Sequence, residues 1–235
     1  MGTLYLIPTP IGNLGDITLR ALKTLFSVDI IACEDTRRTG VLLEKLLAEF
    51  SQNPQDKHKP KLLSYYDQVE QQRIPEIISL LQAGKDIAVV SDAGTPLISD
   101  PGFKLVRSCL EEKIKVVSLP GASSVLTALT ASGLPTDKFM FVGYPPHKPG
   151  HRLQFFASLK TSLEFIPVTV VLFEAPHKVK KTLEDMQMVF GDIEIVFARE
   201  LTKTYEEVKK KTISEALTAF KKKPPKGEFV LLFHL

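Results

Sequence analysis

The chain has 235 residues, of which 44% are hydrophobic, and its formal net charge is +3. A chain of this size can bury one large core or two smaller ones, and so slight a positive charge permits a polyanionic partner without requiring one. Cys33 and Cys109 lie in apolar segments, which predicts two buried thiols in a reducing compartment. The apolar runs are strand-sized and no basic region precedes the first of them, so we expect neither a signal peptide nor a membrane span.

Short apolar runs alternate with segments of helical period along the whole chain. We expect strands at 4–7, 30–33, 87–90, 116–119, 139–142, 168–173, 193–198 and 229–233. We expect helices at 18–26, 39–50, 74–82, 103–112, 123–132, 152–159, 178–189 and 214–220. This alternation predicts an α/β fold with mostly parallel strands. The later strands are more typical of a mixed sheet, in which 206–212 would form an antiparallel edge.

Two segments predict boundaries rather than elements. The polar, proline-containing stretch 51–61 is expected to be an exposed loop. Pro120 and Gly121 follow the expected strand at 116–119, and they divide the chain into two α/β halves of similar size. We therefore expect one domain at 1–119 and a second at 120–235.

Unusual loops follow three strands of the first half. They are Pro- and Gly-rich at 8–16 and 91–102, and acidic at Glu34 and Asp35. A tight connection or an acidic helix cap would explain part of each loop. In a doubly wound sheet, however, such loops meet at the carboxyl edge of the strands, where ligands bind. Neither G-x-G-x-x-G nor G-x-x-x-x-G-K-[ST] is present, so we expect a small-molecule site of another design.

The second half offers its own candidates. Glu174 and His177 follow a buried strand just before a helix, where they are either structural or a general acid–base pair. The charged segment 199–207 is typical of an ion-paired turn, and the lysine runs 209–211 and 221–223 are typical of solvated faces. Metal-ligand spacings such as C-x-x-C and H-E-x-x-H are absent, as is the G-x-S-x-G elbow.

Taken together, several segments resemble the tetrapyrrole-methylase superfamily, and within it the ribosomal RNA small-subunit methyltransferase I group. The segments are 8–17, 34–37, 91–102, 120–124 and 199–203, in the family's order and over nearly the whole chain. The resemblance implies two α/β domains with S-adenosylmethionine in the cleft between them. It also implies a homodimer in the cytoplasm that methylates the ribose 2′-oxygen of a cytidine in 16S rRNA. The missing ligand spacings, separately, lead us to expect no metal.

The resemblance also transfers cofactor residues position by position. From the first domain these would be Pro10, Asp92, Ala93, Gly94, Thr95, Pro96 and Ile98. Ser123, Ser124, Thr127 and Ala128 would lie near the methionine part, and Phe173 and segment 227–229 would border the adenosine. Residues 63–70 depart from the family, because they read LSYYDQVE where many relatives carry histidine and asparagine. No substrate role is transferred to them.

Methyl transfer from a sulfonium mainly requires alignment and the exclusion of water, although a ribose hydroxyl benefits from a nearby base. Glu174 and His177 are our candidates for that catalytic base, with Asp16, Glu34, Asp35, Asp100 and Glu200 left open. Expected substrate contacts are Asn13, Asp16, Arg20, Glu34, Arg37, Asp100, Lys148, Arg152, Glu200 and Lys203, with Arg38 and the basic loop 144–152 as further phosphate contacts. Methylation of a tetrapyrrole carbon, and a non-catalytic module that binds cofactor or RNA, are the alternatives.

Overall fold

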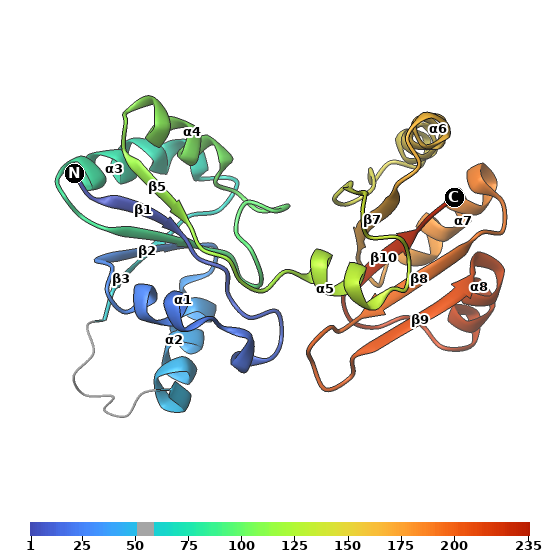
Figure 1. The fold of residues 1–235 in the computed structure, drawn as a ribbon, viewed down its shortest axis with the longest axis horizontal. Helices are drawn as coiled ribbons and strands as arrows, with labels where there is room; N and C mark the ends of the chain where they lie inside the picture. The colour runs from blue at the N-terminus through green and yellow to red at the C-terminus, as the bar shows by residue number, and fades with distance from the viewer. Residues whose placement is uncertain (51–58) are drawn as a thin grey trace. The chain divides into compact units, whose positions relative to one another are not determined.

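The computed structural model describes residues 1–50 and 59–235 and divides the chain into two compact units, Met1–Ser123 and Ser124–Leu235 (Figure 1). This division falls after Ser123, a few residues beyond the break that the sequence suggested before Pro120. Most of the loop expected at 51–61 lies outside the described residues. In the described part of the chain, the structure contains no helix long and apolar enough to cross a membrane.

Unit 1 is a parallel sheet with helices on both faces (Figure 1). Its elements are β1 (Thr3–Leu6), the short 3-10 helix η1 (Leu14–Asp16), α1 (Leu19–Leu25), β2 (Ile30–Cys33), α2 (Thr36–Phe50), β3 (Lys61–Ser64), α3 (Glu70–Gln82), β4 (Ile87–Val90), α4 (Phe103–Glu111) and β5 (Lys115–Ser118). The strand order is β3-β2-β4-β1-β5, and every pairing is parallel. The carboxyl ends of β1, β2 and β4 are therefore neighbours on one edge of the sheet.

Alternating side chains of the central strands supply two separate cores. Ala32 and Val89 pack toward α3 and α4, whereas Ile31 and Ala88 pack toward α1 and α2. Both faces are covered, so β2 and β4 consist of buried residues throughout. This arrangement explains why these strands are continuous apolar runs in the sequence.

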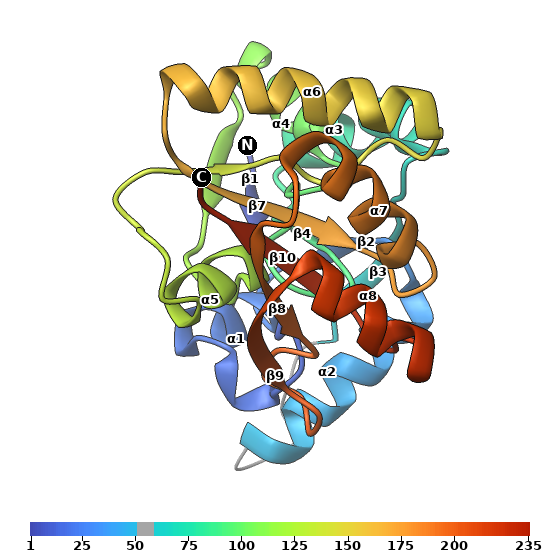
Figure 2. The same cartoon turned by 90° about the vertical axis from the view of Figure 1, so that its right-hand side faces the viewer.

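Unit 2 contains a mixed sheet. Its elements are α5 (Ser124–Ala131), β6 (Phe139–Phe141), α6 (Pro149–Phe165), β7 (Thr169–Glu174), α7 (Val179–Phe190), β8 (Glu194–Arg199), β9 (Glu207–Thr212), α8 (Ile213–Lys222) and β10 (Phe229–Phe233). The order is β6-β7-β10-β8-β9, with β6 parallel to β7 and the other pairings antiparallel. Helices α6, α7 and α8 share one core on a face of this sheet (Figure 2). The expected mixed sheet and its antiparallel edge at 206–212 are confirmed.

Three elements differ most from the sequence expectation. Strand β3 was not among the expected strands, because only one of its residues is buried and it carries no apolar run. Helix α3 begins at Glu70 rather than 74, and α6 runs from Pro149 to Phe165 rather than from 152 to 159. Apolar residues are spread around α6, so its helical period is weak in the sequence.

Candidate cofactor and catalytic site

The loops that follow β1 and β4 are joined by backbone hydrogen bonds. The amide of Thr9 donates to the carbonyl of Gly94 over 2.9 Å, and the amide of Gly94 donates back to Thr9 over 3.0 Å. The Thr9 hydroxyl is buried and donates to the carbonyl of Ser91 over 3.1 Å. A polar loop is thereby locked against the end of the sheet, which satisfies its buried backbone groups.

A side chain at Gly94 would be both strained and crowded. Its φ of 85° lies in the left-handed region, and an added Cβ would stand 3.2 Å from the Cγ2 atom of Ile11. Leu97 and Ser99, with φ of 72° and 65°, continue this unfavourable backbone through the same loop. Backbone strain of this kind costs about 1–3 kcal/mol per residue and is concentrated at functional sites.

The segment after β5 is held in the same region of unit 1. The Thr95 hydroxyl donates to the carbonyl of Ala122 over 3.0 Å. Gly121 lies against the ring of Pro8, so that a Cβ there would come within 2.6 Å of the Pro8 Cβ. The loops at 8–16 and 91–102 and the start of 120–124, which the sequence singled out separately, are therefore neighbours in the structure.

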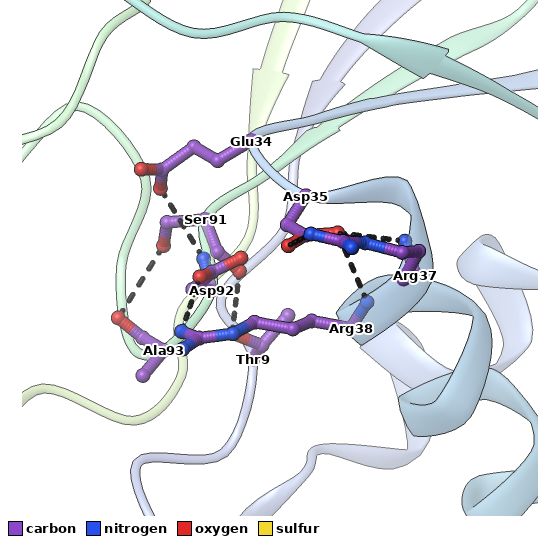
Figure 3. A network of polar contacts seen from close by, with 8 residues as sticks. All are labelled: Thr9, Glu34, Asp35, Arg37, Arg38, Ser91, Asp92 and Ala93. Atoms are coloured by element: carbon purple, nitrogen blue, oxygen red, sulfur yellow. Dashed lines mark hydrogen bonds and ion pairs between the residues drawn. The ribbon is translucent and has the colours of Figure 1, made fainter.

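Carboxylates gather where these loops meet (Figure 3). The Glu34 Oε1 atom accepts a hydrogen bond from the Asp92 amide over 3.3 Å, and Arg38 forms an ion pair of 2.6 Å with the Asp92 Oδ2 atom. The other oxygen of Asp92, Oδ1, is buried and has no hydrogen-bond partner among residues 1–50 and 59–235. A buried acceptor without a donor is costly, so this oxygen is available for a ligand that carries a positive charge or a donor.

Two carboxyl groups of this cluster have raised pKa values. Burial, and after it the negative charge of Asp100, raise the pKa of Glu34 to about 7. Burial also raises the pKa of Asp100 to about 6, against a hydrogen bond from Ser91 that lowers it. Perturbed carboxyl groups at the carboxyl edge of a parallel sheet are typical of a functional site.

Asp35 differs from its neighbour Glu34. Its side chain is half-buried, and hydrogen bonds from the side chain and backbone of Arg37 lower its pKa to about 2. Arg37 therefore forms an ion pair with Asp35, the residue that precedes α2. The side chain of Arg37 is nevertheless 90% exposed to solvent.

Glu70, which was not among the expected site residues, fixes the carboxyl-terminal end of the 91–102 loop. Glu70 is buried and accepts hydrogen bonds from the Gly102 amide over 2.9 Å and the Tyr65 hydroxyl over 3.0 Å. Lys104 completes its surroundings with an ion pair of 3.0 Å. Burial alone would raise the pKa of Glu70, but these partners lower it overall. Tyr65 and Glu70 belong to the segment that departs from the family pattern, and here they support the loop.

In unit 2, the carboxylate of Glu174 has a structural role. It is 4% exposed, and its carboxylate accepts hydrogen bonds from the Ala175 amide over 2.8 Å and from the Thr182 hydroxyl. Ala175 directly follows β7 and Thr182 lies in the first turn of α7, so Glu174 joins the end of β7 to the start of α7. A carboxylate held inward by two donors is poorly placed to accept a proton from a substrate. His177 lies nearby on the chain and is exposed.

Arg152, an expected phosphate contact, lies inside unit 2. Its side chain is buried, and its Nε atom forms a 2.6 Å ion pair with the Oδ2 atom of Asp185. It also donates to the carbonyl of His147 over 3.3 Å. Arg152 therefore holds the 146–147 loop against α7. A buried guanidinium that is already paired is poorly placed to contact a phosphate. The exposed Lys148, which precedes α6, is accessible.

The charged turn after β8 is paired within unit 2. The Glu200 Oε1 atom accepts from the Glu228 amide over 2.9 Å, and Lys203 bridges Glu200 and Glu228 at 3.3 and 2.8 Å. These contacts favour the structural interpretation of Glu200 and Lys203 that the sequence left open. At the end of β7, Phe173 packs against Phe141 and Tyr144, with ring centroids 4.7 and 5.4 Å apart.

A family model described as "Tetrapyrrole (Corrin/Porphyrin) Methylases" matches residues 3–217. The chain belongs to this family. A tetrapyrrole-methylase family member from Synechocystis sp., named Ribosomal RNA small subunit methyltransferase I, is 46% identical over 99% of this chain and 78% of its own length. A protein of the same name from Thermotoga maritima is 44% identical over 99% of this chain and 98% of its own length.

Solved structures confirm the fold of a tetrapyrrole methylase. The methyltransferase CobJ superposes with a TM-score of 0.66 at 17% identity, covering 100% of this chain and 95% of its own. Uroporphyrin-III C-methyl transferase from Thermus thermophilus, complexed with S-adenyl homocysteine, gives a TM-score of 0.65 at 17% identity and covers 98% of this chain and 97% of its own. The family and the two α/β units expected from the sequence are therefore confirmed.

The carboxyl edge of unit 1 fits the cofactor that this family uses. S-adenosylmethionine carries a cationic sulfonium and an ammonium group, and the unpartnered Oδ1 atom of Asp92 is a buried acceptor of the right charge. Within residues 1–50 and 59–235, no group of three or more His, Cys, Asp or Glu side chains is arranged to hold a metal. All the expected cofactor contacts stay predictions: Pro10, Asp92, Ala93, Gly94, Thr95, Pro96, Ile98, Ser123, Ser124, Thr127, Ala128 and Phe173.

Proposed function

We propose that this protein transfers a methyl group from S-adenosylmethionine to the small ribosomal subunit, at the ribose 2′-oxygen of a cytidine in 16S rRNA. The observation that carries the proposal is the 46% identity, over 99% of the chain, to a protein named Ribosomal RNA small subunit methyltransferase I. The carboxylate cluster at the edge of unit 1 supports it independently, because it offers acceptors to a cationic cofactor.

The loop 91–102 would hold the cofactor. Bound there, S-adenosylmethionine would supply an activated methyl group on a positively charged sulfur. Asp92 would accept from a cationic group of the cofactor through its free oxygen, while Arg38 holds the other oxygen in place. The backbone lock between Thr9 and Gly94 would keep this loop in position before binding. Such preorganisation lowers the barrier by fixing the geometry of attack.

Glu34 is the best-placed candidate for the proton acceptor. With a pKa of about 7, its carboxyl group is divided between protonated and ionised forms near neutral pH. A general base works best when its pKa lies near the operating pH. Glu34 would take the proton of the ribose hydroxyl as the oxygen attacks the methyl carbon, and Asp100 would keep the pKa of Glu34 high. His177 stays a second candidate because it is exposed.

We also propose that Asn13, Asp16, Arg20, Arg37 and Lys148 contact the RNA substrate. Arg20, Arg37 and Lys148 are exposed cations, which is the requirement for a contact to a phosphate. The protein would act in the cytoplasm as a homodimer, and sedimentation equilibrium tests the dimer directly by its mass.

The chemistry of the product tests the proposal. Small subunits that lack the modification are incubated with the protein and S-adenosylmethionine, and their 16S rRNA is digested to nucleosides. We expect mass spectrometry to find 2′-O-methylcytidine at one site, and alkaline hydrolysis to leave the bond after that nucleotide intact. A methylated base in place of a methylated ribose would contradict the 2′-oxygen. Methylation of an added uroporphyrinogen, with none on RNA, would favour the tetrapyrrole alternative.

A further inference from the structure

A basic groove lies between β9, α8 and the loop 223–227 of unit 2, and we call it the β9–α8 groove. Its volume is about 470 Å³. Lys209 and Lys211 line it from the strand, Lys223 and Lys226 from the loop after α8, and Tyr205 from the turn before β9. The two lysine runs that the sequence indicated as separate solvated faces thus contribute to one hollow.

The floor of the groove is aromatic. Phe220 of α8 packs edge-on against Phe197 and Phe229, with ring centroids 6.0 and 6.1 Å apart. Lys209 is paired with Phe197 across the two strands, so both side chains lie on the face of the sheet that α8 covers. The lysine stems therefore lie along an apolar surface while their ammonium groups reach its rim.

The positive charge of the groove is only partly neutralised. Lys209 and Arg199 both pair with the single carboxylate of Glu207. Lys211, Lys223 and Lys226 form no ion pair in the part of the chain that the structure describes. These cations line one hollow without bound counter-charge, so the groove attracts a polyanion.

Tyr205 adds a feature that charge alone does not provide. Its side chain is 73% exposed at the rim of the groove, although burial of a tyrosine ring is favourable. An exposed aromatic ring beside lysines is the arrangement on which an unpaired base stacks while its backbone phosphates meet the cations. Stacking requires a base that is free of a duplex.

We propose that the β9–α8 groove binds a single-stranded segment of the RNA substrate, with phosphates at Lys211, Lys223 and Lys226 and one base on Tyr205. This inference rests on the proposed function, because it assigns a surface to that same substrate. Lysines on an edge strand also prevent unwanted strand pairing, which accounts for Lys209 and Lys211. Edge protection does not account for Lys223, Lys226 and Tyr205, which come from loops.

Charge reversal tests the phosphate contacts. Lys223→Glu combined with Lys226→Glu is compared with Lys138→Glu combined with Lys181→Glu, a pair that makes the same change in net charge on exposed lysines of unit 2 that do not line the groove. The probe is a short fluorescent oligocytidine, titrated at several salt concentrations. We expect the groove pair to weaken binding about tenfold and to reduce the salt slope by about 1.4. The control pair should keep the wild-type slope.

Substitution of Tyr205 tests the stacking contact. Tyr205→Ala should weaken binding of the oligocytidine about fivefold or more, and Tyr205→Phe should retain the wild-type affinity because it keeps the ring. Circular dichroism and S-adenosylmethionine affinity report that each variant is folded. Equal loss in the two lysine pairs, an unchanged Tyr205→Ala variant, or equally tight binding of polyglutamate would each overturn the inference.

Different results would contradict the proposed function and the proposal that the β9–α8 groove binds RNA. If the wild-type protein methylates small subunits but the groove variants bind RNA as it does, the groove inference alone is wrong. If the wild-type protein methylates no RNA, the proposed function is wrong whatever the groove binds.

Discussion

Thr9 and Gly94 lie on loops that follow different strands, yet each donates its amide to the carbonyl of the other, over 2.9 and 3.0 Å. This pair makes the loops after β1 and β4 a single structure at the carboxyl edge of unit 1. The geometry of that structure depends on a glycine, because Gly94 has a φ of 85°.

Gly94→Ala should therefore affect both stability and cofactor affinity. The left-handed backbone costs about 1–2 kcal/mol for a residue with a Cβ, and the new methyl group would also press on Ile11. Gly84→Ala is the matched control, because Gly84 has a φ of 90° and no atom within 4 Å of an added Cβ. Urea unfolding should show destabilisation of both variants, and a larger one for Gly94→Ala because of the contact with Ile11. Calorimetry should show weaker S-adenosylmethionine binding for Gly94→Ala alone, and equal affinities would remove the loop from the cofactor site.

Asp92→Asn should weaken cofactor binding about tenfold or more while the protein stays folded. The substitution removes the negative charge opposite a cationic ligand, and a hydrogen bond between charged groups contributes about 1.5–3 kcal/mol. Asp35→Asn is the control, since Asp35 lies on the same edge and is half-buried like Asp92, but both of its oxygens already accept hydrogen bonds from Arg37 and Arg38. The same loss of affinity in both variants would indicate a general effect of charge rather than a contact of Asp92.

The sequence predicted the part of the fold that depends on local pattern. Strands such as 30–33 and 87–90 are buried on both faces, so their apolar runs are continuous and their positions were predicted to the residue. The neighbourhood of β1, β2 and β4 followed from the doubly wound topology. Strand β3 was missed because an edge strand with one buried residue needs no apolar run.

The sequence predicted which loops form the candidate site, but it did not predict which side chains the polar residues there pair with. Arg152 and Glu174 are polar residues next to loops, which suits a functional role from sequence alone. Their partners, Asp185 and Thr182, lie on α7, and nothing local in the sequence indicates that these pairs are buried. Likewise, the role of Glu70 depends on a contact with Gly102 across the fold.

The raised pKa of Glu34 makes stability depend on pH. The folded protein holds this proton up to about pH 7, whereas the unfolded chain releases it near the ordinary value of 4.5. The contribution is therefore fully present below pH 4.5 and is lost as the pH rises through 7. Glu34→Gln mimics the protonated form, so it should stabilise the protein relative to wild type by about 1–3 kcal/mol at pH 8 and far less at pH 5.

Urea unfolding at the two pH values measures this difference. Glu44→Gln, on an exposed position of α2, controls for the loss of one negative charge. A stability difference for Glu34→Gln that does not change with pH would show that the carboxyl group titrates normally. In the same variant, methyl transfer should fall about a hundredfold if Glu34 accepts the proton of the ribose.

Arg152→Ala should destabilise unit 2 without changing RNA recognition. It would leave the buried carboxylate of Asp185 without a partner, at a cost of about 3–5 kcal/mol. Arg152→Met combined with Asp185→Leu removes both charges and should recover most of the loss. If the double variant is folded and its RNA affinity still falls with a flatter salt dependence, Arg152 meets phosphate after all.

The central claim is that the carboxyl edge of unit 1 serves methyl transfer to RNA of the small ribosomal subunit. The most direct measurement is the transfer of tritium from methyl-labelled S-adenosylmethionine to unmodified small subunits, with wild-type protein, Asp92→Asn and Asp35→Asn in parallel. We predict label in the 16S rRNA with wild type and Asp35→Asn, and little with Asp92→Asn at limiting cofactor. No label in the RNA with folded, cofactor-binding wild-type protein would contradict the account.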